Sequence, residues 1–306
     1  GLGDVYKRQD WGSAMLVEKY IDTAMPNASQ NEKIIASQYV LANCGYNVRL
    51  ALCGNHVVML IPYVEHVFEK SYLNIDGKRY YIYPNVEDEG SFRSCELPKG
   101  AELGKDMGLR FTGKTVIGDE AKPFRYEAAG ITLQGEVPTG VMPLLDEYPI
   151  IDIPTVAASV VDKSLRDDVV KQIRAQVQDL GEQEAANRIL RFIQMGFPYA
   201  TDDEQFHREK YFYFEESLYY PKNDCEDRAI FYAYLVHEIL GLDVHLIQFP
   251  GHECTAVAFH EPVENGTSYE YKGKKFYICD PTYIGAKIGK CMPSYAKESP
   301  QIEVWY

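Results

Sequence analysis

The sequence predicts an α+β protein in which helices pack on antiparallel sheets, and three observations support this prediction. The chain contains an internal repeat, so that one structural unit occurs twice. Each copy has the same succession of patterns, namely a helix, two strands and a β-hairpin. Between the copies, residues 86–155 are rich in glycine and proline and contain short alternating stretches, which indicates a β-rich connector.

The repeat is visible as two pairs of similar segments at one constant spacing. Residues 45–56 resemble residues 241–252, and residues 77–82 resemble residues 273–278. The offset is 196 residues in both cases, since 241 − 45 and 273 − 77 are equal. A register kept over this distance without a gap is typical of an internal duplication. We therefore expect residues 10–85 to be a degenerate, partial copy of the C-terminal unit.

The second copy has the clearer pattern. Residues 225–240 carry apolar side chains along one helical face, and Gly241 follows as the residue that ends the helix. Strands are expected at residues 244–249 and 252–259, and residues 269–280 are expected to form a hairpin around a Lys-Gly turn. The first copy has Asp-Gly at the equivalent turn, which is a strong signal for a two-residue hairpin loop.

Two further helices are expected before the second copy, at residues 165–180 and 182–195, because each segment is apolar along one face. The sequence therefore predicts a degenerate half-domain at residues 10–85, the connector, and a larger domain at residues 156–306. Residues 1–9 resemble the translated end of a sequencing-library transposon, so we exclude them from the fold prediction. With the authentic start in doubt, the compartment stays open, and a periplasmic or cell-surface location is favoured over the cytoplasm.

Composition excludes several classes of partner. The formal charge is −14 and the isoelectric point is near 5.0, so no basic stripe is available to neutralise nucleic-acid phosphates. No apolar run approaches the length of a membrane-spanning segment. The seven cysteines are irregularly spaced and include no CxxC pair, which argues against a disulfide framework and a structural zinc site, although one or two disulfides stay open.

Cys225 is the candidate nucleophile. It falls in the first turn of the predicted helix, where backbone N–H groups and the helix dipole favour a thiolate and offer a donor to an oxyanion. Its neighbours Asp224, Glu226 and Asp227 oppose this, because nearby carboxylates raise the pKa of a thiol. A histidine close to the sulfur is therefore required to activate it.

The candidate partners of Cys225 are His252 and Asp280. The pattern places His252 at the start of one strand and Asp280 at the end of a neighbouring strand. A carboxylate in this position can hold the tautomer of the imidazole and stabilise the imidazolium. The spacing thus predicts a Cys225–His252–Asp280 triad.

These motifs carry a family resemblance. Asn223-Asp-Cys-Glu-Asp, then Gly251-His, then Cys279-Asp-Pro-Thr make residues 165–295 similar to the transglutaminase-like cysteine hydrolase superfamily of bacterial type, a branch of the papain-like fold. The resemblance implies a papain-like core, no cofactor and no metal, and hydrolysis of a peptide or protein amide. The animal cross-linking enzymes have a tryptophan after the nucleophile where this chain has Glu226, so we favour a peptidase or amidase over a cross-linking transglutaminase.

The first copy lacks most of this chemistry. At the 196-residue offset, Ser29 replaces the cysteine, His56 is retained, and Pro84 replaces the carboxylate. We expect this copy to be inactive. Because the lineage tolerates such loss, an inactive or weakly active binding scaffold is the second hypothesis for the whole chain. A third, in which the predicted triad binds zinc, is disfavoured by its spacing. The sequence does not determine the substrate or the oligomeric state.

Overall fold

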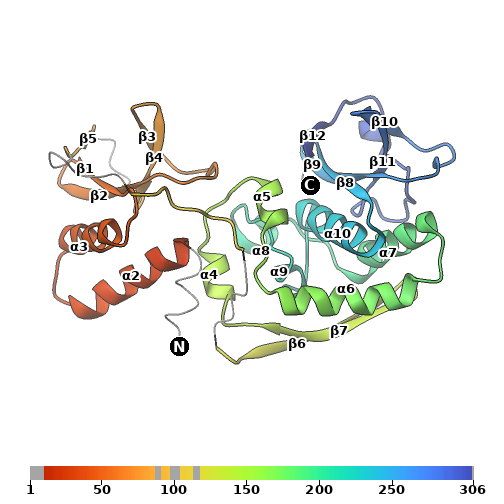
Figure 1. The fold of residues 1–306 in the computed structure, drawn as a ribbon, viewed down its shortest axis with the longest axis horizontal. Coiled ribbons are helices and arrows are strands. Elements are labelled where there is room, and N and C mark those ends of the chain that lie inside the picture. The colour runs from red at the N-terminus through yellow and green to blue at the C-terminus, as the bar shows by residue number, and fades with distance from the viewer. Residues whose placement is uncertain (1–9, 87–90, 97–103, 113–117, 305–306) are drawn as a thin grey trace. The chain divides into compact units, whose positions relative to one another are not determined.

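The computed structural model describes residues 10–86, 91–96, 104–112 and 118–304. The predicted adaptor-derived segment 1–9 lies outside these residues. The chain divides into two compact units, the first formed by Gly1–Phe111 with Leu144–Asp152, and the second by Thr112–Pro143 with Ile153–Tyr306. Both units are mixed helix and antiparallel sheet, as the predicted α+β class requires (Figure 1). Within the described residues, no helix is long and apolar enough to cross a membrane.

The first unit is one sheet with two helices. Helix α3 packs on strands β1 and β2, and α2 packs on α3 (Figure 1). The strand order is β3-β4-β2-β1-β5. The elements are α2 (Asp10–Ala24), α3 (Gln30–Asn43), β1 (Arg49–Cys53), β2 (His56–Ile61), β3 (Tyr72–Ile75), β4 (Lys78–Tyr83) and β5 (Phe92–Ser94). The short helix α4 (Met142–Asp146) is divided between the units, because the first unit resumes at Leu144.

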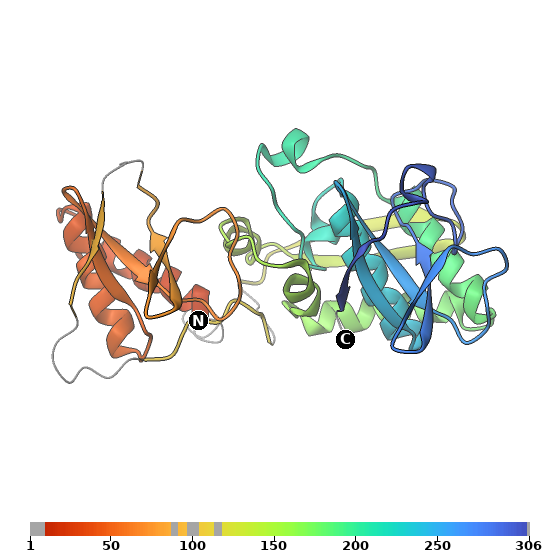
Figure 2. The same cartoon turned by 90° about the horizontal axis from the view of Figure 1, so that it is seen from above.

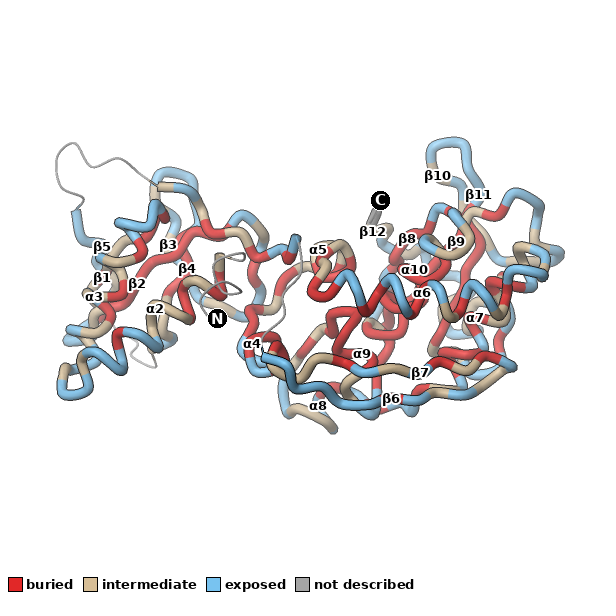
Figure 3. Tube along the Cα trace, turned by 60° about the horizontal axis from the view of Figure 1, so that its bottom comes forward, coloured by how far each residue is buried: buried red, intermediate tan, exposed pale blue. Residues whose placement is uncertain are grey.

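The second unit has the same kind of sheet, in the order β10-β11-β9-β8-β12. Helix α10 packs on β8 and β9, while α6 and α7 separate it from a long β6–β7 hairpin (Figures 1 and 2). Figure 3 shows α10 buried along most of its length. The elements are β6 (Ala121–Ala128), β7 (Ile131–Pro138), α5 (Ile153–Ala158), α6 (Lys163–Val177), α7 (Glu182–Gly196), α8 (Asp202–Phe206), α9 (Glu216–Tyr219), α10 (Cys225–Leu240), β8 (Asp243–Phe249), β9 (His252–Ala258), β10 (Ser268–Tyr271), β11 (Lys274–Cys279), the 3₁₀ turn η1 (Pro293–Tyr295) and β12 (Gln301–Val304).

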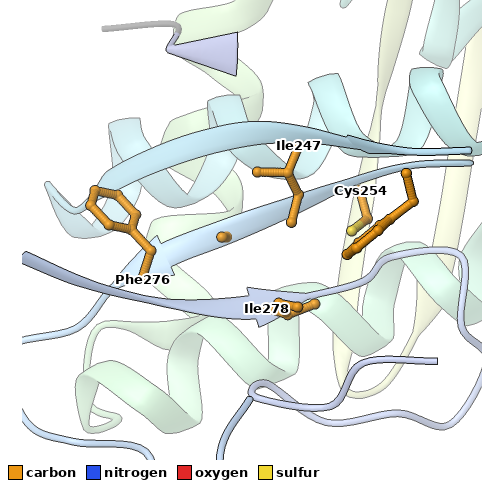
Figure 4. Close-up of a cluster of buried hydrophobic side chains, with 6 residues drawn as sticks. Ile247, Cys254, Phe276 and Ile278 are labelled. Carbon is orange, nitrogen blue, oxygen red and sulfur yellow. The ribbon is translucent and has the colours of Figure 1, made fainter. Parts of the chain in front are cut away.

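The internal repeat is present in the fold. The two sheets have equivalent strand orders, and the 196-residue offset maps the bounds of β3 onto β10 and of β4 onto β11 without a shift. The buried cores also correspond, since five core positions of the first copy map onto five of the six in the second. Figure 4 shows the cluster of the second copy. These pairs are Ala51 with Ile247, Val58 with Cys254, Leu60 with Ala256, Tyr80 with Phe276, and Ile82 with Ile278.

The turn residues explain why both copies keep this register. Asp76 and Gly77 have φ angles of 53° and 79°, and Lys272 and Gly273 have 48° and 78°. Two successive residues with positive φ form the turn whose twist matches a two-residue hairpin. Gly241 ends α10 in the left-handed conformation at φ 70°, as its position after the apolar pattern predicted.

The segment expected to be a connector, 86–155, is divided between the two units. Strand β5 and residues 104–111 belong to the first unit, where β5 extends the sheet beside β1. The β6–β7 hairpin belongs to the second unit, because its apolar side chains pack against α6 and α7. Glycine and proline content indicated the β-rich character of this segment, but only the packing assigns each strand to a unit.

Candidate active site

Cys225 is the first residue of α10, and a capping box holds the start of this helix. The Asp224 carboxylate accepts the backbone N–H of Asp227 at 3.2 Å, and the Asp227 carboxylate accepts the N–H of Asp224 at 3.2 Å. The Cys225 side chain is therefore placed in the first turn, as predicted, where the helix dipole favours negative charge. The residue is 8% exposed.

The immediate surroundings of the sulfur favour the neutral thiol. Cys225 Sγ donates a hydrogen bond to Glu226 Oε2 at 2.9 Å. Burial and then the Glu226 carboxylate raise the pKa of the thiol far above its ordinary value, while the backbone N–H of Glu253 acts in the opposite direction. The prediction that the acidic neighbours oppose a thiolate is thus confirmed.

His252 and Asp280 are in contact, as the order of the strands predicted. His252 Nε2 lies 2.9 Å from Asp280 Oδ2, and both side chains are buried. The other oxygen of Asp280 accepts the backbone N–H groups of Thr282 at 2.8 Å and Tyr283 at 3.1 Å. One carboxylate therefore begins the Asp-Pro-Thr turn and holds the imidazole, which explains the need for an aspartate before this proline.

The sulfur lies close to the start of β9, the strand that His252 begins. The backbone N–H of Glu253, the residue directly after His252, reaches Cys225 Sγ. In the described residues, however, no hydrogen bond joins Cys225 to His252. Side chains alternate along a strand, so His252 shares its sheet face with Cys254, in the core cluster, while Glu253 belongs to the face of α10.

Aromatic and sulfur groups complete the surroundings of His252. The ring of Tyr295 stacks on the imidazole with centroids 5.3 Å apart and an interplanar angle of 6°. Donor atoms of His252, Cys254 and Asp280 lie within 4.8 Å of one another. The residue grouped with the histidine and aspartate as a potential metal ligand is therefore Cys254, whereas the zinc hypothesis drawn from the sequence used Cys225. All seven cysteines are free thiols.

Buried acids surround the start of α10. Carboxylate oxygens of Asp202, Asp224 and Asp227 lie within 4.8 Å of one another. Burial, with repulsion from Glu226, raises the pKa of Asp202 to about 6. Burial and repulsion from the neighbouring carboxylates raise the pKa values of Asp224 and Asp227 well above their ordinary value. Asp202 begins the capped helix α8, and its side chain is buried.

Two residues near the site carried no signal in the sequence. Glu253 is buried with neither carboxyl oxygen hydrogen-bonded, and burial raises its pKa to about 9. Gln194 Nε2 donates to the carbonyl oxygens of Asp280, Tyr283 and Ala286 at 2.9–3.1 Å and so holds the loop that follows Asp280. A single glutamine or glutamate within a helix or strand pattern gives no indication of such a role.

In the first copy, the positions equivalent to Cys225 and Glu253 make hydrogen bonds that hold the start of helix α3. The exposed Ser29 side chain accepts the N–H of Glu32 and donates to its carboxylate, so it caps α3. His56 is exposed. The N–H of Val57, equivalent to that of Glu253, donates to Asn31 at 2.9 Å. The same strand amide therefore points at the start of the helix in both copies, and only the second copy presents a thiol to it.

Comparison with known proteins adds no assignment, since no protein-family model matches this chain and no similar sequence was found among curated proteins.

Proposed function

We propose that this protein is a thiol hydrolase of the transglutaminase-like kind with a papain-like core, which cleaves a peptide or protein amide through Cys225, His252 and Asp280. The observation that carries the proposal is the meeting of the α10 start with the β9 start. There the Cys225 sulfur contacts the backbone of the residue that follows His252, and His252 is held by Asp280.

The proposed reaction begins with proton transfer. Because His252 lies on the face of β9 opposite α10, the step requires a rearrangement at the start of β9 that brings the imidazole to the Cys225 sulfur. His252 Nε2 is engaged by Asp280, so Nδ1 then receives the thiol proton. The thiolate attacks the amide carbonyl carbon, and the backbone N–H groups at the start of α10 stabilise the oxyanion. The imidazolium then gives its proton to the leaving amine as the C–N bond breaks. Water deprotonated by His252 attacks the thioester, the C–S bond breaks, and the acid product and free thiol are released.

The test is mass spectrometry after incubation of the full chain with a library of peptides and amides. We expect a transient acyl adduct on the peptide that contains Cys225, and loss of both adduct and turnover in Cys225→Ala. His252→Ala is the matched variant, because it keeps the thiol and removes the proposed base. Turnover that persists in Cys225→Ala would exclude the proposal.

One observation favours a second candidate, a binding module without catalysis. The Cys225 thiol is hydrogen-bonded to Glu226 and not to His252, and its pKa is raised. A thiol that stays protonated is a poor nucleophile. If library peptides bind the wild type and Cys225→Ala with equal affinity and neither protein releases product, the binding module is the correct function.

A further inference from the structure

A histidine, a cysteine and an aspartate meet on the face of the second sheet that is opposite α10. His252 and Cys254 are two residues apart on β9, so their side chains point to the same face. The strand register pairs Cys279 with Thr255, and the next step along the ladder places Asp280 across from Cys254. Side chains directly opposite on neighbouring strands have Cβ atoms about 4.5–5.5 Å apart. The sheet geometry thus brings three different donor groups together.

The spacing of these donors fits a zinc ion. The donor atoms of His252, Cys254 and Asp280 all lie within 4.8 Å of one another, and the imidazole and carboxylate are 2.9 Å apart. Two donors bound to one tetrahedral zinc ion lie about 3.3–3.7 Å apart, because each bond is about 2.0–2.3 Å long. Side-chain shifts of about 1 Å therefore suffice to bring all three donors to the ion.

The chemistry of the three groups favours zinc over calcium or magnesium. Thiolate, imidazole and carboxylate are all zinc ligands, whereas calcium and magnesium take oxygen ligands. All three side chains are buried, where an isolated charge is costly. A thiolate and a carboxylate together balance the two charges of the ion while the imidazole stays neutral, and the thiol proton is released to solvent.

The first copy shows that packing does not require these donors. At the 196-residue offset, Val58 corresponds to Cys254 and Pro84 corresponds to Asp280. Val58 lies in the buried core of the first sheet, so an apolar side chain fills the position that Cys254 has in the second (Figure 4). The histidine is retained as His56, which is exposed. The thiol and the carboxylate beside a buried histidine are therefore particular to the second copy.

The surroundings hold the donors in place. The second oxygen of Asp280 accepts two backbone N–H groups of the loop that follows, and the ring of Tyr295 stacks on His252. Groups of this kind orient metal ligands and strengthen metal binding. Cys291 and Tyr295, both partly exposed, pack against the cluster that contains Cys254. This partly exposed cover gives an ion a path to the site that leaves the sheet intact.

We propose that His252, Cys254 and Asp280 bind a zinc ion, with water in the fourth position. The site is separate from Cys225, whose sulfur contacts the backbone N–H of Glu253 on the other side of β9. An effect on catalysis follows and rests on the proposed function. Bound zinc holds His252 away from α10 and so opposes the rearrangement that brings the imidazole to the Cys225 sulfur. Zinc is therefore expected to inhibit the proposed hydrolase.

The test is titration of the reduced full chain with cobalt(II), a spectroscopic substitute for zinc. A cobalt–thiolate bond absorbs in the near ultraviolet, and we expect this band to saturate at about one cobalt ion per chain and to disappear when zinc is added. Cys254→Ser should lose the band. Zinc affinity, measured by competition with a chromogenic chelator, should fall at least about tenfold in Cys254→Ser and in His252→Ala, which keeps the thiol. Circular dichroism confirms that each variant is folded.

The matched control is the double variant Cys44→Ser with Cys95→Ser, which removes two exposed thiols and is expected to keep the band. Loss of the band in this control would mean adventitious binding at exposed thiols. Absence of the band in the wild type, or an equal band in folded Cys254→Ser, would overturn the site. So would equal zinc affinity of the wild type and folded His252→Ala. A band that is lost in Cys225→Ala would place the metal at the proposed nucleophile and overturn it as well.

A separate assay tests the effect on catalysis. Zinc should inhibit turnover of a library substrate by the wild type and leave Cys254→Ser active, because Cys254 has no part in the proposed reaction. Equal inhibition of both proteins would show that zinc acts at the Cys225 sulfur and would overturn the regulatory role. Absence of turnover in the zinc-free wild type would count against the proposed function, while the cobalt spectrum still decides the metal site.

Discussion

Replacement of Glu226 by glutamine is expected to activate Cys225. The thiol donates to the Glu226 carboxylate at 2.9 Å, and this carboxylate is the largest charged contributor to the raised pKa of the thiol. A hydrogen bond to a charged group contributes about 1.5–3 kcal/mol, and about 1.4 kcal/mol corresponds to one pKa unit. Glu226→Gln should therefore lower the pKa of the thiol by about one to two units.

The rate follows from this shift. At a pH below the pKa of the Cys225 thiol, the thiolate fraction of Glu226→Gln is about 10- to 100-fold higher than that of the wild type. The intrinsic nucleophilicity of the thiolate falls as its pKa falls, with a Brønsted coefficient of about 0.45. The net expectation is alkylation about 3- to 12-fold faster.

The assay is the rate of iodoacetamide modification of the Cys225 peptide, followed by mass spectrometry as a function of pH. Resolution by peptide separates Cys225 from the exposed thiols of Cys44 and Cys95. Asp203→Asn, which removes an exposed acid from α8, is the matched control and should leave the rate unchanged. An unchanged or slower rate in Glu226→Gln would refute the argument that this carboxylate keeps the sulfur protonated.

Three further predictions concern the groups around the site. Asp280→Asn should lower turnover of a library substrate by about 10³-fold or more while the protein stays folded by circular dichroism, because the imidazolium loses its carboxylate; retained turnover would remove Asp280 from the mechanism. Glu253 has a folded-state pKa of about 9, above its ordinary value, so its burial destabilises the fold progressively as pH rises from the unfolded pKa towards 9. In Glu253→Gln, the unfolding free energy measured with urea should no longer fall over this pH range. An unchanged slope of unfolding free energy against pH would contradict the prediction. Gln194→Ala should cost about 2–4 kcal/mol in unfolding free energy, since three carbonyl groups lose their donor; a loss below about 0.5 kcal/mol would show that water replaces the amide.

Much of the fold followed from local sequence patterns. The helix over residues 225–240 was predicted from one apolar face and a terminal glycine, and the structure has it at those bounds. The two-residue turns were predicted from Asp-Gly and Lys-Gly, because glycine adopts positive φ without steric cost. The repeat was predicted from similarity at one offset, and the strand orders confirm it.

The candidate site was predictable only as far as the contact of His252 with Asp280. That contact depends on the pairing of β9 with β11, because His252 begins β9 and Asp280 follows β11. The separation of the imidazole from the Cys225 sulfur was not predictable, because it depends on which face of β9 packs against α10. Alternation along a strand groups His252 with Cys254, but only the packed sheet shows that this face is the one opposite the helix.

The sequence by itself determined the duplicated α+β architecture, the helix start that carries Cys225, and the acids beside it, because these depend on residues close together in the chain or on the constant offset of the repeat. Only the tertiary structure decided that the Glu226 carboxylate accepts a hydrogen bond from the Cys225 thiol, and that Asp202 and Glu253 are buried. The physical reason is that desolvation and hydrogen bonding depend on every group that surrounds an atom, and most of those groups come from distant parts of the chain.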